Sequence, residues 1–199
     1  MRPMSRPSPI YRFIGLLSYP LVYGLFRLKA RGHERVPGTG FVLAANHLSN
    51  LDPWALGLPL FPKRWLRFMA KSELYWWPAR LVLDGAGAFK VRRGEQDRAA
   101  IQTAVELVRA GEIVVMFPEG TRRRKGLRKR RTAQPHTGAA RIAQLAGTRL
   151  VPAAIKGTDR LARLGKWEVA YGEPFEPGDD ARAATERLMQ EIDELYETL

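Results

Sequence analysis

The residues of this chain whose types and spacing could do chemistry are a histidine and an aspartate, His47 and Asp52, in the stretch Ala44–Pro53. An imidazole can take a proton from a hydroxyl near neutral pH, and a carboxylate beside it fixes the tautomer and stabilises the imidazolium that forms. The pair could therefore act as a general base and its orienting partner. The alternative is structural, because an aspartate before a proline commonly begins a helix and a lone loop histidine often has no catalytic role.

Two elements must hold this pair, and the sequence predicts both. The apolar run Phe41–Ala45 predicts a buried strand. Asp52 followed by Pro53 predicts the start of a helix, with the aspartate at the N-cap and the proline at the first helical position. His47 then lies in a short loop between strand and helix, where α/β proteins commonly present reactive groups.

Two further strand ends carry charged residues. The apolar run Ile113–Phe117 predicts a strand that ends in a turn, where the carboxylate of Glu119 and the guanidinium of Arg122 come together. The run Phe89–Val91 predicts a short strand that ends at Arg92. Because parallel strands collect their following loops at one edge of a sheet, we expect both arginines on the same side as the candidate base.

Strands and helices alternate along the chain, which predicts an α/β fold with a largely parallel or mixed sheet flanked by helices. The expected strands are 41–45, 65–70, 89–91, 113–117, 150–155 and 167–171, and the expected helices are 54–60, 95–110, 137–146 and 181–199. At 199 residues, with no internal repeat and no linker in the sequence, the chain is expected to form one domain.

Composition narrows the function classes. The absence of cysteine excludes disulfides, cysteine zinc sites and a cysteine nucleophile, and three scattered histidines suggest no metal cluster, so no metal or cofactor is expected. The net charge is +13, but residues 176–199 carry eight acids against two arginines, so residues 1–175 hold +19. A segment with this much positive charge is expected to bind an anionic partner: nucleic acid, a membrane surface, or an acidic substrate or carrier.

The N-terminal residues 10–28 are rich in aromatic side chains and flanked by cations. Their uncharged part, 13–26, has 14 residues, fewer than the roughly 20 that a spanning helix needs, and Pro20 is expected to break it further. We therefore expect residues 1–30 to associate with a membrane interface and residues 31–199 to form the catalytic domain. The alternative is a pair of short helices packed on the body of the protein.

Two other segments allow more than one interpretation. Residues 122–131 include eight basic residues in ten, which suits a nucleic-acid arm or a solvated loop that touches anionic lipid or an acidic carrier. The run lacks the interleaved aromatics that stack on bases. The aromatic segment 72–78 either lines an apolar groove or packs as part of a helix.

Four blocks, in this order, resemble the glycerolipid acyltransferase family and, within it, the bacterial 1-acylglycerol-3-phosphate acyltransferases. Residues 46–52 are similar to N-H-x-x-x-x-D, residues 87–92 are similar to G-x-x-F-x-x-R but one residue shorter, residues 117–122 match F-P-E-G-T-R in full, and residues 151–155 are similar to V-P-V-x-I. The first and third blocks, about seventy residues apart, carry most of a resemblance that covers about residues 30–175.

The resemblance implies an O-acyltransferase that moves a fatty acyl group from acyl-CoA or acyl carrier protein to the sn-2 hydroxyl of 1-acylglycerol 3-phosphate, giving phosphatidic acid in phospholipid biosynthesis. His47 would be the general base and Asp52 its partner, and the freed alkoxide would attack the thioester directly. The other implied site residues all bind substrate: Glu119 and Gly120 at the glycerol part, Thr121 in the same turn, Arg92 and Arg122 at the phosphate, and Pro152 in the pocket wall.

We expect a peripheral or interfacially anchored enzyme on the cytoplasmic face of the cell membrane. Its expected partners are the anionic membrane surface, a lysophospholipid acceptor and acyl-CoA or acyl carrier protein, and no nucleic acid. The chain departs from the family where the basic run 122–131 precedes His136-Thr137-Gly138 in place of a short polar segment. That departure leaves another lysophospholipid or a lyso-aminolipid open as the acceptor. The remaining alternative is a basic membrane- or nucleic-acid-binding protein without catalysis. The intact motif residues argue against this alternative.

Overall fold

The computed structural model describes residues 7–91, 98–120 and 135–199. The strands are β1 (Lys29–Arg31), β2 (Phe41–Ala45), β3 (Leu66–Lys71), β4 (Ala88–Val91), β5 (Ile113–Met116), β6 (Leu150–Lys156) and β7 (Glu168–Tyr171). The α-helices are α1 (Pro9–Leu25), α2 (Asp52–Gly57), α3 (Ala79–Gly85), α4 (Arg98–Arg109), α5 (Gly138–Ala146) and α6 (Ala181–Glu197). Short 3-10 helices are η1 (His33–Arg35), η2 (Leu58–Leu60), η3 (Ser72–Leu74) and η4 (Thr158–Arg163).

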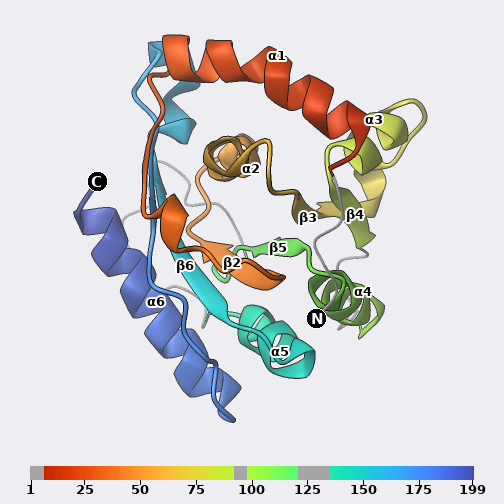
Figure 1. The fold of residues 1–199 in the computed structure, drawn as a ribbon, viewed down its shortest axis with the longest axis vertical. Coiled ribbons are helices and arrows are strands. Elements are labelled where there is room, and N and C mark those ends of the chain that lie inside the picture. Colours follow the sequence, from red (N-terminus) through yellow and green to blue (C-terminus); the bar gives the residue numbers. More distant parts are fainter. Residues whose placement is uncertain (1–6, 92–97, 121–134) are drawn as a thin grey trace.

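Within the described residues, seven strands form one sheet in the order β1-β7-β6-β2-β5-β3-β4 (Figure 1). The five strands from β6 to β4 run parallel, whereas β7 is antiparallel to β6 and β1 pairs parallel with β7. The expected α/β domain with a largely parallel or mixed sheet is therefore confirmed in its mixed form. The sequence interpretation missed β1 and α3, which are too short for a clear periodic pattern.

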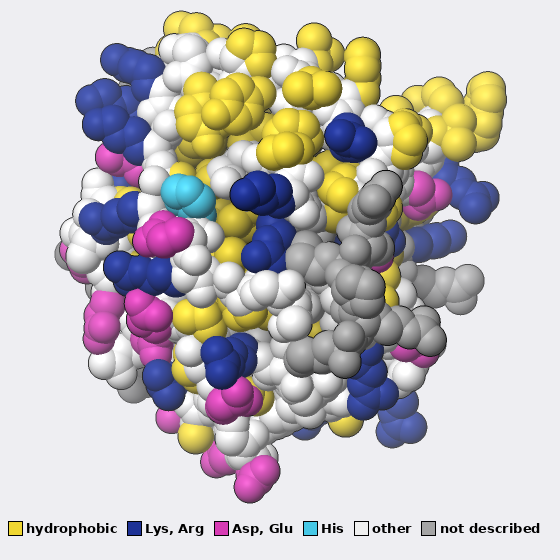
Figure 2. Space-filling view, in the orientation of Figure 1, with side chains coloured by type: hydrophobic (Ala, Val, Ile, Leu, Met, Phe, Trp, Pro, Cys, Tyr) yellow, Lys and Arg dark blue, Asp and Glu magenta, His cyan; other side chains and the backbone are white. Residues whose placement is uncertain are grey.

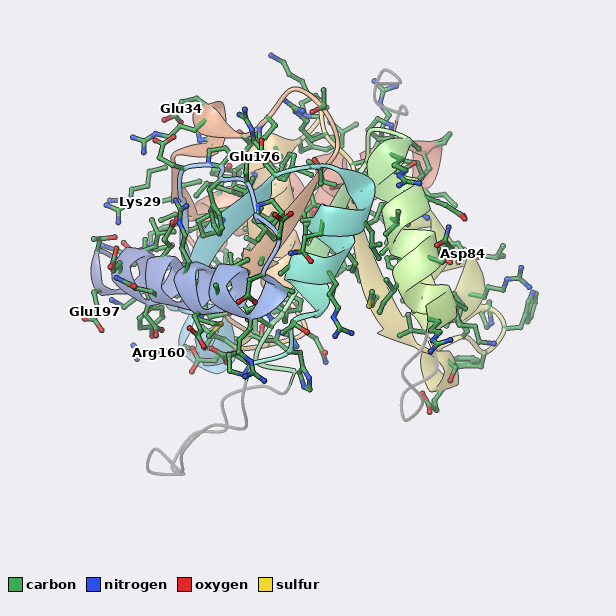
Figure 3. The ribbon with its side chains drawn as sticks, turned by 90° about the horizontal axis from the view of Figure 1, so that it is seen from below. Lys29, Glu34, Asp84, Arg160, Glu176 and Glu197 are labelled. Atoms are coloured by element: carbon green, nitrogen blue, oxygen red, sulfur yellow. The ribbon has the colours of Figure 1, made fainter. Side chains whose placement is uncertain are left out.

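Helices cover both faces of the sheet. Figure 1 shows α2 between α1 and the sheet, and Figure 3 shows α4, α5 and α6 side by side on the opposite face. Successive residues of β2 fill the two resulting cores: Leu43 packs in the core that contains Leu56 of α2, and Ala44 packs in the core that contains Ala140 of α5. A strand buried on both faces needs apolar residues at every position, which explains the unbroken run before the His47 loop.

The N-terminal segment forms one continuous helix, α1, so the expected break at Pro20 is wrong. Pro20 and Leu16, whose carbonyl would normally bond to position 20, are both exposed, and water can reach the freed carbonyl. On the inner side, a Cβ at Gly15 would lie 2.4 Å from the ring of Phe61, so a larger residue there would force that ring to move. The helix therefore packs on the body along one side and exposes the other.

A small apolar cavity of about 50 Å³ lies where α1 meets α2 and β3, lined among others by Tyr11, Trp54 and Phe68. Across the part of the chain that the structure describes, no helix combines the length and the apolar character needed to cross a membrane. Association of residues 1–30 with a membrane interface, and the division of the chain after residue 30, stay predictions.

Candidate active site

His47 and Asp52 meet in the loop that follows β2. His47 Nδ1 lies 2.7 Å from Asp52 Oδ2. That oxygen also accepts hydrogen bonds from the backbone amides of Leu48, at 2.7 Å, and Ser49, at 2.9 Å. Because a carboxylate oxygen surrounded in this way can only accept, Nδ1 carries the proton of the neutral imidazole. The free lone pair is then on Nε2, which is the nitrogen that can take a proton from a substrate.

The two members of the pair differ in exposure. The side chain of Asp52 is fully buried, whereas the imidazole of His47 remains 16% exposed. A buried carboxylate needs hydrogen bonds on both oxygens, and the hydroxyl of Thr158 serves the second one, 2.6 Å from Oδ1. The imidazole therefore reaches the surface above a carboxylate that the protein holds in place. A base that must meet a bound substrate requires this arrangement.

Asp52 does not cap α2, which corrects the prediction from its place before Pro53. Leu51 is the N-cap residue and Asp52 is the first residue of the helix. The carboxylate turns back to the preceding loop and bonds the amides of Leu48 and Ser49. The aspartate thus orders the loop that carries His47, in addition to orienting the imidazole.

The loop begins at Asn46, a buried residue whose side chain pairs with the backbone of Ile155 in β6. Its Nδ2 donates to the carbonyl of Ile155 at 2.9 Å, and the amide of Ile155 donates to its Oδ1 at 2.8 Å. The side-chain amide thereby extends the pairing of β2 with β6 beyond the last strand residue. It fixes the point at which the chain leaves the sheet toward His47.

The turn after β5 lies against the same imidazole. The rings of His47 and Phe117 are stacked, with centroids 4.1 Å apart and planes 18° apart. The amide of Gly120 closes the turn on the carbonyl of Phe117 at 3.0 Å, and Glu119 lies partly buried between them. Gly120 has a φ of +68°, and a Cβ there would lie 2.6 Å from the ring of His136, so this position requires glycine. The two motif loops share one edge of the sheet, as the parallel strands predict.

Three predicted substrate-binding residues, Arg92, Thr121 and Arg122, lie outside the described residues, as does the basic run 122–131. Pro152 pairs with Ala44 within the sheet, and its ring packs beside the Cα of Gly172. It is therefore in the body of β6, and its role in a substrate pocket stays a prediction. Among the side chains that the structure describes, no group of three or more His, Asp or Glu could hold a metal ion.

The sequence interpretation missed two residues that touch the pair, Phe117 as a stacking partner and Thr158 as a hydrogen-bond donor. A signal for Thr158 was present. Gly157 and Thr158 directly follow β6, and β6 runs parallel to β2, so its following loop must reach the same sheet edge as His47.

Comparison with known proteins gives consistent matches. Residues 27–156 match the family model described as Acyltransferase. A 1-acyl-sn-glycerol-3-phosphate acyltransferase of Bacillus subtilis (strain 168) is 34% identical over 186 residues, which cover 86% of this chain and 89% of that protein. A probable 1-acyl-sn-glycerol-3-phosphate acyltransferase of Mycoplasma pneumoniae is 30% identical over 78% of this chain and 58% of that protein. The crystal structure of the LPA acyltransferase PlsC from Thermotoga maritima shares the fold, with a TM-score of 0.63 at 22% identity, covering 92% of this chain and 86% of that one.

Proposed function

Because this chain belongs to the acyltransferase family, we propose that it transfers a fatty acyl group from a thioester donor to the sn-2 hydroxyl of 1-acylglycerol 3-phosphate. The observation that carries the proposal is the 2.7 Å contact between His47 Nδ1 and Asp52 Oδ2, which leaves Nε2 as the accepting nitrogen of a partly exposed imidazole. The printed names of the two curated relatives support the acceptor. Either acyl-CoA or acyl carrier protein would serve as the donor.

The contacts of His47 and Asp52 define which proton transfers accompany the reaction. Nε2 of His47 takes the proton of the acceptor hydroxyl while the oxygen attacks the thioester carbonyl, so an ester C–O bond forms and the C–S bond breaks. The leaving thiolate then takes that proton from the imidazolium, which releases a free thiol and restores the neutral imidazole. Asp52 holds the Nδ1 proton throughout and stabilises the positive charge while it exists. No acyl-enzyme is needed, because the acceptor oxygen is itself the nucleophile.

The substrate contacts of this proposal rest on the family resemblance. Glu119 and Gly120 belong to the turn that stacks on His47 and would hold the glycerol part. Arg92 and Arg122 would bind the phosphate, because a guanidinium matches a phosphate in bidentate geometry. If Arg122→Ala keeps the wild-type preference for acceptors with a terminal phosphate over acceptors without one, this arginine does not recognise the phosphate.

Attachment to an anionic membrane surface, on the cytoplasmic face of the cell membrane, is part of the proposal. Figure 2 shows hydrophobic side chains gathered over the edge where α1 and α3 lie. The exposed apolar residues on and next to these two helices include Phe13, Leu16, Leu17, Leu21, Trp76, Trp77, Leu81 and Val82. Aromatic and aliphatic side chains of this kind, with arginines nearby, suit a lipid interface.

The decisive test offers the purified protein acyl-CoA with a panel of lysolipids and identifies each product by mass. Thiol release that depends on 1-acylglycerol 3-phosphate is expected, and His47→Ala should lower turnover roughly 10²- to 10⁴-fold, as loss of a general base does. Preference for a lyso-aminolipid or another lysophospholipid would change the assigned acceptor substrate but leave the proposed acyl transfer unchanged. Turnover in His47→Ala above a tenth of wild type would contradict the mechanism.

A further inference from the structure

Asp52 receives a hydrogen bond from a residue far away in the sequence. The hydroxyl of Thr158, the first residue of η4, lies 2.6 Å from Asp52 Oδ1. Thr158 is 1% exposed and Asp52 is 0% exposed, so water does not compete for this contact. The hydroxyl of Ser49 also approaches Oδ1, but at 3.4 Å, close to the limit of a hydrogen bond. Thr158 is therefore the principal donor to this oxygen.

The chain brings Thr158 to this place through a constrained turn. Its neighbour Gly157 has a φ of +91°, and a Cβ there would lie 2.0 Å from the carbonyl oxygen of Lys166, so the turn depends on glycine. Two residues earlier, both backbone groups of Ile155 are held by the side chain of Asn46. The start of the His47 loop and the segment that carries Thr158 are thus fixed to each other.

The two oxygens of Asp52 have separate partners. Oδ2 accepts hydrogen bonds from His47 Nδ1–H and from two backbone amides, while Oδ1 accepts the hydrogen bond of the Thr158 hydroxyl. A donor on each oxygen fixes the rotation of the carboxylate about its Cβ–Cγ bond, and hydrogen bonds to an ionised group are the stronger ones. We propose that Thr158 is a positioning residue, whose hydroxyl holds Asp52 at the angle that orients His47 for proton transfer. This inference rests on the role of His47 as general base in the proposed function.

The test compares two substitutions at Thr158 with a matched control. Thr158→Val removes the hydroxyl and keeps the shape, Thr158→Ser keeps the hydroxyl, and Thr148→Val removes another buried threonine hydroxyl, which donates to the Gly40 carbonyl at 2.6 Å. We expect Thr158→Val to lower kcat roughly 10- to 100-fold with little change in KM, because a charge-assisted hydrogen bond is lost. Thr158→Ser should stay within about threefold of wild type. Thr148→Val should lower the midpoint of thermal unfolding while kcat is retained.

A double variant separates positioning from general loss of structure. If Thr158 acts through Asp52, then Thr158→Val should cause no further loss of kcat once Asp52→Ala has been introduced, because groups that act as a unit are not additive. A further loss in that background would overturn the proposal. So would equal losses of kcat in Thr158→Val and Thr148→Val, or no recovery of kcat by Thr158→Ser.

An NMR measurement tests the inference without relying on acyl transfer. The proton between His47 and Asp52 is expected to give a low-field NMR signal with no substrate present, which its loss in His47→Ala would assign. Thr158→Val should shift or broaden this signal, whereas Thr148→Val should leave it unchanged; an unchanged signal in Thr158→Val refutes the inference. If wild type transfers no acyl group while the signal responds as expected, the proposed function fails and the positioning role stands.

Discussion

The imidazole of His47 lies nearly parallel to the ring of Phe117, with centroids 4.1 Å apart and planes 18° apart. Asp52 fixes the tautomer of the imidazole from one side, and Phe117 limits the tilt of its plane from the face. The two partners come from different segments, since Asp52 begins α2, which follows β2, and Phe117 directly follows β5. Orientation of the base therefore depends on both motif loops at once.

Replacing Phe117 by leucine should lower kcat roughly 2- to 10-fold, because an aromatic pair contributes about 0.5–1.5 kcal/mol beyond its buried area. Leucine keeps most of the volume and removes the flat face. Steady-state kinetics checks this, with Phe175→Leu as the control, since Phe175 is buried under the guanidinium of Arg187. That control should lose stability and keep kcat. Equal kcat in Phe117→Leu and wild type would show that the stacking does not orient the base.

Replacing Asp52 by asparagine should lower both activity and stability. An NH₂ group in place of Oδ2 would face the amides of Leu48 and Ser49 and leave them unpaired. In place of Oδ1 it would donate to the Thr158 hydroxyl, whose own buried proton then loses its acceptor. We expect roughly 1–3 kcal/mol less free energy of unfolding and a fall in kcat of at least about 10²-fold. Denaturant unfolding and steady-state kinetics measure the two effects.

Asp180→Asn is the matched control for this substitution. Asp180 caps α6, with hydrogen bonds from the amides of Arg182 and Ala183, and asparagine caps helices equally well. The control should therefore be close to wild type in both measurements. If Asp52→Asn is as stable as Asp180→Asn, the carboxylate does not order the His47 loop as its contacts indicate.

Sequence patterns predicted the strand Phe41–Ala45 and the loop after it because the signal is local: five apolar residues stop at a polar one, and a helix start follows. The environment of Asp52 was predicted incorrectly for the same reason. Its N-cap assignment used only its place before Pro53, whereas the carboxylate bonds to Thr158, 106 residues away. The expected parallel sheet places the loop after residues 150–155 at the same edge as His47, but the strand order that decides which side chains touch there is not a local pattern.

The same limit applies to α1 and β7. Pro20 predicts a break when only the helix is considered, but here it lies on the exposed side, where a missing backbone hydrogen bond leaves no buried group unpaired. The run ending at Tyr171 was predicted as a strand, yet nothing local shows that it pairs antiparallel to β6. Hydrophobic pattern thus predicts the elements, and tertiary packing decides their direction and continuity.

Alkaline pH should weaken the packing of α1 on the body. Burial raises the pKa of Tyr11 to about 12, although a hydrogen bond with the backbone of Leu66 acts in the opposite direction and lowers this pKa by a smaller amount. The folded protein keeps this proton between pH 10 and 12, where the unfolded chain loses it, so the stabilising contribution present below pH 10 falls as the pH rises toward 12. Tyr11→Phe should make that decline shallower, by as much as roughly 2 kcal/mol near pH 12. Urea unfolding at several pH values measures it, and equal slopes for the two proteins would contradict the assignment.

Membrane binding should depend on the exposed side of α1. Leu17, on α1, is 68% exposed, and Leu145, on α5, is 55% exposed, so Leu17→Ser and Leu145→Ser remove matched side chains from opposite faces of the sheet. Burying a leucine in an apolar phase contributes about 1.5–3 kcal/mol, so Leu17→Ser should weaken binding to vesicles with phosphatidylglycerol roughly tenfold or more. Leu145→Ser should bind the vesicles as wild type does. Added salt should weaken the binding of wild type and of both variants, because basic side chains of the protein contribute to its attraction to the anionic lipid. Co-sedimentation with vesicles measures the partition, and equal binding of the two variants would remove α1 as the membrane contact.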